Sequence, residues 1–290
     1  MEKVKKKAPK ERILRSTGEK VCHEIVFWLF VVYAITLLYP FFFLLMNSFK
    51  SNPIEMMKNP LGLPQSFSFT PYLQAIVEMD IGEMLFNTVT LAVGQTLVSM
   101  ALTCMAAYTL AKYDFKGNKF IYTFVIVCSI VPTFGAEASM YKLMTNVLHL
   151  RNTYLGMLLM CGGFGVTFLY LHSFFKEIPW SFAESAMMDG ASDFRVFVQI
   201  MLPLAKNGIL VFTIMKFMGY WNDYWTSYLY YREHPTLAVG LAMLSERAGH
   251  TLPLSVFFAG TILCIIPVLI LYAIFSDKLM SNLNAGGIKG

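Results

Sequence analysis

Two ionisable residues interrupt the apolar stretch at residues 207–231, and their chemistry needs an explanation. Lys216 and Asp223 lie seven positions apart, two turns of a helix, so a continuous helix would place them on roughly one face. An ionisable side chain inside a membrane segment indicates a functional site by default. Aromatic rings can stack on sugar rings, while amides and carboxylates bond hydroxyl groups. This face could therefore line the path of a polar solute such as a sugar, with six candidate residues: Lys216, Trp221, Asn222, Asp223, Tyr224 and Trp225.

A structural role is the alternative for these six residues. Asp223, Trp221 and Trp225 could anchor a helix at the membrane interface, and Lys216 could reach the headgroups or pair with a neighbouring helix. Glu137 is a further ionisable candidate near a predicted helix end.

The other reactive residue types form no catalytic or metal-binding pattern. The five histidines are scattered, no G-x-S-x-G motif occurs, and the five cysteines lie in or beside apolar runs without a C-x-x-C pair. No Walker A pattern occurs, so any ATP that drives this chain must bind another polypeptide. The sequence thus predicts no catalytic residue, no metal site and no enzyme. We expect the glycines at 162, 163 and 165 to permit close helix packing.

Composition places most of the chain in lipid. The 290 residues are 56% hydrophobic and 14% charged, whereas soluble domains carry about 25% charged residues. A spanning helix needs roughly 20 apolar residues, and backbone groups in lipid must be satisfied within the element. We therefore predict an all-α membrane protein with six transmembrane helices, in the runs 25–49, 84–111, 120–136, 152–175, 207–231 and 251–276.

The basic residues predict the orientation. Eight Lys and Arg precede the first span, and most of the others fall in loops predicted on the same side. Because cytoplasmic segments carry the excess of Lys and Arg, we expect both termini in the cytoplasm. The expected division is a basic tail at 1–24, a membrane domain at 25–276 and a tail at 277–290. Topology explains the positive charge, so we expect membrane lipid and no nucleic acid as a partner.

The cytoplasmic loop at residues 176–206 has helix signals of its own. Ser181 followed by Glu184 is a capping-box pattern, which predicts a helix that begins at Ser181. Gly190 is suited to end that helix in a left-handed conformation. A second short helix follows, and Pro203 breaks it before the fifth span. The sequence therefore predicts a helix–turn–helix shelf beneath the membrane, which is a docking surface.

This loop resembles the EAA loop of ABC importer permeases. The family pattern is Glu-Ala-Ala, three residues, Gly, nine residues, Ile, any residue and Leu-Pro. Here Glu184-Ser185-Ala186 is followed by Gly190 and by Ile200-Met201-Leu202-Pro203 at the same spacings, with serine at 185 as the one departure. An ordinary amphipathic linker is the alternative. The resemblance implies these ATPase-coupling residues: Glu184, Ser185, Ala186, Met187, Asp189, Gly190, Ala191, Ile200, Leu202 and Pro203.

Further segments resemble the maltose-type carbohydrate permeases. They are residues 47–50, 87–88, 106–111, 221–225 and 285–290, so the likeness covers the chain from about residue 25 to its end. It implies the transmembrane domain of a type I ABC importer in the plasma or inner membrane. The implied cargo is a sugar or an oligosaccharide, and this chain would form half of the translocation pathway.

The same resemblance implies an assembly. Its members would be a second homologous permease subunit, a dimer of ATP-binding ABC subunits and an extracellular or periplasmic solute-binding protein. ATP and Mg²⁺ would bind the ATPase subunits, and this chain would bind no cofactor. The alternative function is a self-sufficient secondary transporter of a small polar solute. Such a protein more often has broken helices in paired halves, and the sequence shows no internal repeat of that kind.

Overall fold

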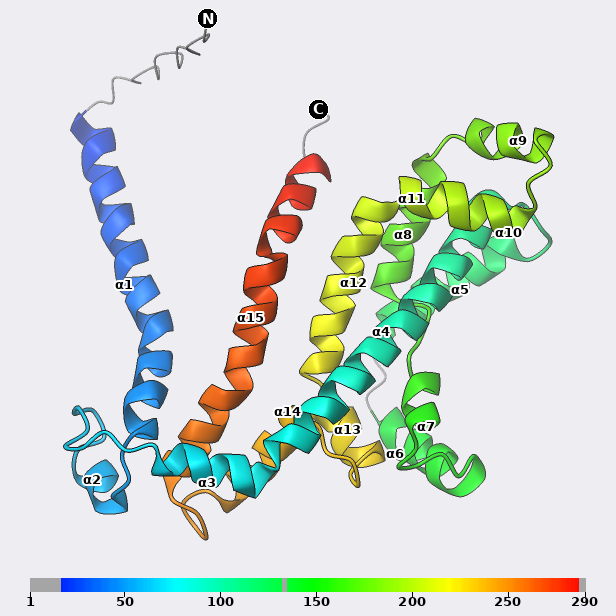
Figure 1. The fold of residues 1–290 in the computed structure, drawn as a ribbon. Coiled ribbons are helices and arrows are strands. Elements are labelled where there is room, and N and C mark those ends of the chain that lie inside the picture. Colours follow the sequence, from blue (N-terminus) through cyan, green and yellow to red (C-terminus); the bar gives the residue numbers. More distant parts are fainter. Residues whose placement is uncertain (1–16, 132–134, 287–290) are drawn as a thin grey trace, which may run out of the picture.

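The computed structural model describes residues 17–131 and 135–286, and its secondary structure there is helices joined by short non-helical segments (Figure 1). One isolated β-bridge joins Ala248 and Leu252. In chain order the helices, with η for two π-helical turns, are α1 (Thr17–Ser48), α2 (Pro53–Lys58), α3 (Thr70–Met79), α4 (Ile81–Lys112), α5 (Asn118–Ile130), α6 (Ala136–Lys142), η1 (Leu143–Val147), α7 (Tyr154–Leu159), α8 (Val166–Glu177), α9 (Ser181–Met188), α10 (Asp193–Val196), η2 (Phe197–Met201), α11 (Leu202–Leu204), α12 (Lys206–Trp221), α13 (Trp225–Tyr230), α14 (Leu237–Arg247) and α15 (Leu254–Gly286).

Three of the described helices are long and apolar enough to cross a membrane alone. They are α1 over 21–48, the whole of α4, and α15 over 254–274. A fourth candidate joins 193–204 to α12, but the chain bends by 82° between them. The remaining predicted runs are interrupted: α5 has 13 residues, about 20 Å of helix, and the run 152–175 is split into α7 and α8. The count of six spans therefore stays a prediction.

The helix α4 lies at the centre of the fold. It packs against α8 and α12 and, near its first turns, against α14. Several polar side chains on α4 are buried, and its threonines satisfy themselves locally: the hydroxyls of Thr88, Thr96 and Thr103 donate to carbonyls one turn earlier at 2.6–2.7 Å. Such back-bonding lets a spanning helix carry hydroxyl groups without exposing them to lipid.

The helix α1 stands apart from this centre. It packs on α15, where the rings of Phe43 and Phe258 meet edge to face at 5.8 Å, and the two helices diverge toward the top of Figure 1. Most of its apolar side chains are exposed on all sides. A helix with an apolar surface all round is suited to lipid or to a second membrane protein. Of the predicted basic tail, residues 1–16 lie outside the described residues, and 17–24 belong to α1.

The two ends of the helices form two different surfaces. Figure 1 shows the start of α1, the end of α15 and the helices α9–α11 on one side, and α2, α3, α13 and α14 on the other. On the second side Lys50 is fully buried and its Nζ donates to the carbonyl of Asn59 at 2.7 Å. Asn47 Nδ2 donates to the carbonyl of Pro60 at 3.0 Å. These bonds fix the segment between α1 and α3.

Packing between α4 and α7 gives a stability prediction. A methyl group added at Gly94 would overlap the Tyr154 hydroxyl, which donates to the carbonyl of Thr90 at 2.8 Å. We expect Gly94→Ala to lower the free energy of unfolding by about 1–3 kcal/mol, as overpacking does. Thermal unfolding of the purified chain in detergent measures this. Gly219→Ala is the control, because no atom lies within 4 Å of that added methyl; equal unfolding temperatures for the two variants would contradict the packing.

Candidate functional site

The helix α9 begins at Ser181 as predicted, but the predicted capping box is wrong. The N-cap is Trp180, whose side chain makes no capping bond and whose carbonyl accepts the amides of Ala183 and Glu184 at 2.8 and 3.1 Å. Ser181 is therefore already helical, and its hydroxyl is not placed to cap. Its carbonyl instead accepts a hydrogen bond from Ser185 Oγ at 2.9 Å.

Gly190 ends α9 as predicted. It lies in the left-handed region with φ +82, its amide donates to the carbonyl of Met187, and the amide of Ala191 donates to Ala186, both at 3.0 Å. This pair of bonds is the Schellman arrangement, which satisfies the last carbonyls of a helix. An L side chain at 190 would be strained in this conformation.

The residues of the resemblance divide into two groups. Ala186, Met187, Ala191 and Leu202 are partly buried and pack on the cluster of apolar residues under the shelf. Ile200 is half-buried, and Pro203 follows the π-helical turn η2. The exposed members are Glu184, Ser185, Asp189, Gly190 and Pro203. The first group holds the shelf, and the second leaves a surface free for contact.

Aromatic side chains tie the shelf to α4 and α8. The rings of Tyr108 and Phe197 lie 4.9 Å apart, Tyr108 meets Phe175 at 5.7 Å, and Tyr113 meets Trp180 at 5.7 Å. These residues come from the end of α4, from α8 and from the loop. The sequence predicts packing for Phe197 and places Tyr108 in a segment of the resemblance, but it does not indicate that Phe175, Tyr113 and Trp180 join the same cluster. The shelf is therefore fixed to two helices of the central core.

Polar contacts strengthen the same junction. The Tyr113 hydroxyl donates to Asp193 Oδ1 at 2.9 Å, and Lys112 Nζ donates to the carbonyl of Ile178. Burial raises the pKa of Tyr113, and its hydrogen bonds to Tyr108 and Asp193 raise it further. The phenol thus stays protonated and remains a donor at neutral pH.

The outer face of the shelf is apolar and open. Met188 is 88% exposed, and Phe182 and Phe194 are also exposed. Phe182 lines a groove of about 320 Å³ between the end of α8, the start of α9 and α11. Its lining includes Ile178, Pro179 and Phe182. Exposed apolar side chains around a groove are typical of a protein interaction site.

The prediction that Lys216 and Asp223 share one helical face is wrong. The helix α12 ends at Trp221, and the chain is not helical from 222 to 224. Asn222 Nδ2 bonds the carbonyl of Met218 at 2.8 Å, and Asp223 Oδ1 accepts the amide of Thr226 at 3.1 Å, at the start of α13. Both polar side chains bond local backbone, which ends one helix and starts the next.

The six candidate residues separate in space. Trp221, Asn222 and Tyr224 line a cavity of about 610 Å³ with residues of α14 and α15. Trp221 is otherwise buried in the core against Phe217, ring to ring at 5.6 Å. Trp225 Nε1 donates to Glu137 Oε2 at 3.0 Å. Lys216, Asp223 and Trp225 do not line that cavity.

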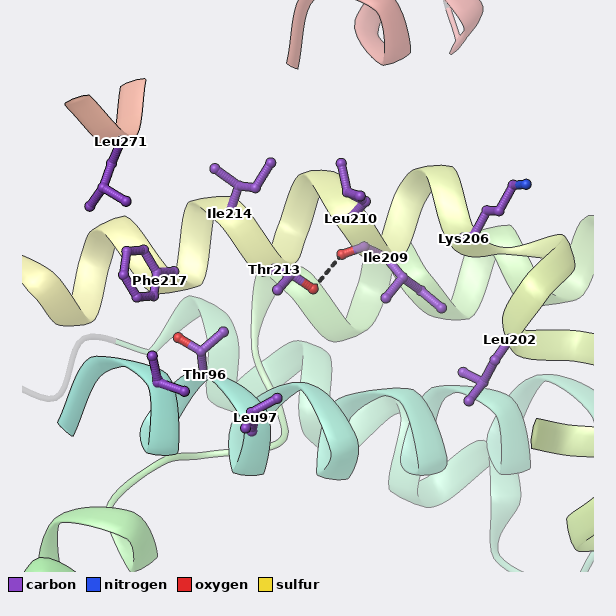
Figure 2. A pocket seen from close by; sticks show the side chains of 11 residues that line it. Thr96, Leu97, Leu202, Lys206, Ile209, Leu210, Thr213, Ile214, Phe217 and Leu271 are labelled. Atoms are coloured by element: carbon purple, nitrogen blue, oxygen red, sulfur yellow. Dashed lines mark hydrogen bonds between the residues drawn. The ribbon is translucent and has the colours of Figure 1, made fainter. Parts of the chain in front are cut away.

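A second hollow follows α12 toward the shelf. Figure 2 shows side chains of α4, α12 and α15 around a groove of about 580 Å³, with Lys206 near its shelf end. Its lining is almost wholly apolar, and Thr213 Oγ1 bonds its own helix at the carbonyl of Ile209, at 2.7 Å. This groove has few groups that could bind the hydroxyls of a sugar.

The Tyr113 contact gives a second prediction. Tyr113→Phe removes the hydrogen bond to Asp193, and we expect a local loss of about 1 kcal/mol, the net worth of one hydrogen bond. Hydrogen exchange measured by mass spectrometry should then be faster in residues 190–200 and unchanged in α15. Tyr170→Phe, at an exposed ring of α8, is the control. Equal exchange in the two variants would show that the bond does not hold the shelf.

This chain is similar to known membrane transport proteins. A family model described as "Binding-protein-dependent transport system inner membrane component" matches residues 99–281. The chain is similar to the diacetylchitobiose uptake system permease protein NgcG of Streptomyces coelicolor, with 29% identity, covering 89% of this chain and 86% of NgcG. It is 31% identical to the maltodextrin transport system permease protein MalD of Streptococcus pneumoniae, covering 89% and 92%.

One further relative and one solved structure are also similar to this chain. The arabinooligosaccharides transport system permease protein AraQ of Bacillus subtilis is 30% identical, covering 90% of this chain and 94% of AraQ. A crystal structure of a bacterial ABC transporter involved in the import of the acidic polysaccharide alginate superposes with a TM-score of 0.77 at 21% identity, covering 92% of this chain and 99% of that chain. The latter shows a shared fold.

Proposed function

Because this chain belongs to the family of binding-protein-dependent transport system inner membrane components, we propose that it forms half of an oligosaccharide pathway through the membrane. It is a permease subunit of an ABC importer, a transport component and not an enzyme. The alternative of a self-sufficient secondary transporter is not retained, since the family works with a binding protein. Relatives whose names specify diacetylchitobiose, maltodextrin and arabinooligosaccharides support an oligosaccharide as the cargo.

The shelf is the surface that an ATPase subunit contacts in this proposal. The observation that supports this contact is that the loop has a packed side and an exposed side. Ala186, Met187 and Leu202 pack on the core, while Glu184 and Met188 are exposed. A surface anchored in this way transmits displacement to α4 and α8 as a rigid body. ATP and Mg²⁺ then act on the ATPase dimer, and this chain needs no cofactor.

A second, homologous permease subunit completes the pathway in this proposal. The apolar side chains of α1 are exposed on all sides, and a helix of this kind can pack on another membrane subunit. Lys216 together with the cavity at Trp221, Asn222 and Tyr224 supplies the pathway residues on this side. An extracellular or periplasmic binding protein delivers the cargo to the surface formed by α2, α3 and α14. The membrane domain at 25–276 then lies between cytoplasmic tails at 1–24 and 277–290.

The experiment that tests this function is reconstitution of the assembly. The full chain is purified in mild detergent from its native host together with its bound subunits, and ATP-dependent uptake of oligosaccharides into proteoliposomes is measured with the binding protein present. Co-purification of an ATPase and a second permease with ATP-driven uptake is the expected result. Oligosaccharide uptake by this chain alone, without ATP, would contradict the proposal.

A substitution on the shelf tests the coupling surface. Met188→Glu places a charge on an 88% exposed apolar side chain without disturbing the core. We expect loss of the co-purifying ATPase subunit by about tenfold or more, because interface positions cost 2 kcal/mol or more when a charge is buried there unpaired. The measurement is the ATPase-to-permease ratio by quantitative mass spectrometry. Met57→Glu, on an 83% exposed side chain of α2, is the matched control and should retain the ATPase.

Labelling tests the orientation. In a chain whose five cysteines are replaced by serine, Met57→Cys and Met188→Cys each give one exposed thiol. A membrane-impermeant maleimide added to intact cells or spheroplasts that make this chain without its ATPase subunit should label position 57, and position 188 only after the membrane is permeabilised. The opposite pattern would place the shelf outside and refute the assignment of the termini.

A further inference from the structure

The fourth apolar run is broken in the middle of the fold. The helix α7 ends at Leu159 and α8 begins at Val166, and residues 160–165 between them are not helical. Non-helical backbone at membrane depth occurs only where it is buried in protein or lines a water-filled cavity. One side of the break is buried, since a methyl group added at Gly163 would lie 2.9 Å from Leu102 Cβ of α4. The other side is not, because Gly162 and Phe164 are exposed.

The helix α4 supplies the buried wall of this break. Ser99 Oγ donates to the carbonyl of Gly162 at 3.0 Å, and Gln95 Nε2 donates to the carbonyl of Met157 at 3.3 Å. Both side chains are buried and lie near the middle of the 32-residue helix. Cys161 is buried beside them. The break is thus a fixed polar feature at mid-helix depth.

The helix α12 brings a cation to the same place. The Lys216 ammonium lies 5.9 Å from the centre of the Tyr220 ring and near the Cys161 thiol of the break. Tyr220 in turn interacts with Ser99 and Cys161. Both Lys216 and Tyr220 are only partly buried, and Gly219 between them has open space where a side chain would stand. This face of α12 therefore opens away from the chain.

Lys216 has no carboxylate partner within the described residues. The ion pair found there joins Arg247 to Glu78 at 2.8 Å, between α14 and α3. Asp223 lies near Tyr220 and Cys161, but it makes no ion pair with Lys216, and one of its carboxylate oxygens accepts the amide of Thr226. An ammonium at membrane depth requires an anion or water. Gly162 is exposed although its carbonyl accepts a hydrogen bond from Ser99, and it has no side chain to cover the rest of its backbone. Uncovered non-helical backbone at this depth favours an aqueous path over lipid.

We propose that Lys216 and Tyr220, beside the break at residues 160–165, form a subsite for an acidic group on the transported saccharide. The ammonium binds the carboxylate or sulfonate, while Tyr220 and the exposed carbonyls bind neighbouring hydroxyls. The inference rests on the proposed function, and it narrows the substrate class from oligosaccharides to acidic ones. In this inference the saccharide contacts Lys216 and Tyr220 on α12 and not the cavity at Trp221.

The test is ATP-dependent uptake by the reconstituted importer with its binding protein. The probes are a mixture of tri-uronides, built from galacturonate, glucuronate or mannuronate, and the corresponding neutral trisaccharides, with uptake measured by mass spectrometry. The wild-type importer should take up an acidic probe in preference to its neutral counterpart. Lys216→Met should lower that uptake by about tenfold or more, as expected for one lost charge-assisted hydrogen bond. Lys216→Arg should retain most of it, because the cation remains.

The control is Lys206→Met, an exposed lysine of the same helix near the shelf, which should transport the acidic probe like the wild type. Equal uptake by Lys216→Met and wild type, or wild-type uptake of neutral probes alone, would overturn the inference. Loss of the second permease from the Lys216→Met assembly would also overturn it, because Lys216 would then pair with that subunit. Failure of every probe to enter with ATP would instead contradict the proposed function.

Discussion

The structure depends on hydrogen bonds between side chains of α4 and the backbone of non-helical segments around it. Lipid cannot satisfy a free amide or carbonyl, so each break in a neighbouring helix needs a partner from within the protein. The side chain of Asn87 bonds the carbonyl of Pro235, Thr88 Oγ1 accepts the amide of Leu237, and Ser99 bonds the break before α8. Lys112 does the same at the entry to the shelf. One continuous helix thereby holds three discontinuous segments around it: the turn before α14, the break before α8 and the entry to the shelf.

This arrangement explains how a shelf outside the membrane can act on a site within it. The ring of Tyr108 packs on Phe175 and Phe197, so the end of α4, α8 and the loop form a single packed unit. The same α4 carries Gln95 and Ser99 at the break beside Lys216. Interfaces of packed side chains move as bodies and do not deform continuously. In the proposed function, a shift of the shelf therefore reaches the break beside Lys216 through one helix.

Local signals predicted much of this architecture. The all-α class, the start of α9 at Ser181 and the left-handed Gly190 follow from apolar runs and from backbone preferences of single residues, and the structure confirms them. The predicted capping box is wrong because Trp180 occupies the N-cap position, so Ser181 is the first helical residue and cannot be the cap. The shared face of Lys216 and Asp223 was wrong because Asn222 and Asp223 bond local backbone and end α12. The glycines at 162, 163 and 165 predicted close packing, which Gly163 makes, but an apolar run does not reveal a break within it. The carbonyl of Gly162 in this break is bonded by Ser99, which lies over 60 positions away in the sequence.

The exposed side chains of the shelf also bear on how much of this protein a cell can hold. Phe182, Met188 and Phe194 are exposed apolar side chains of the shelf, near charged Glu184 and Asp189 in the sequence, and in the proposed orientation the shelf faces the cytosol. When this chain is made in excess of its ATPase partner, these apolar side chains remain uncovered. Exposed apolar side chains are what chaperones and membrane proteases recognise in unassembled subunits. If the shelf is the ATPase contact, as proposed, the supply of the ATPase subunit limits the amount of this subunit that persists in the membrane.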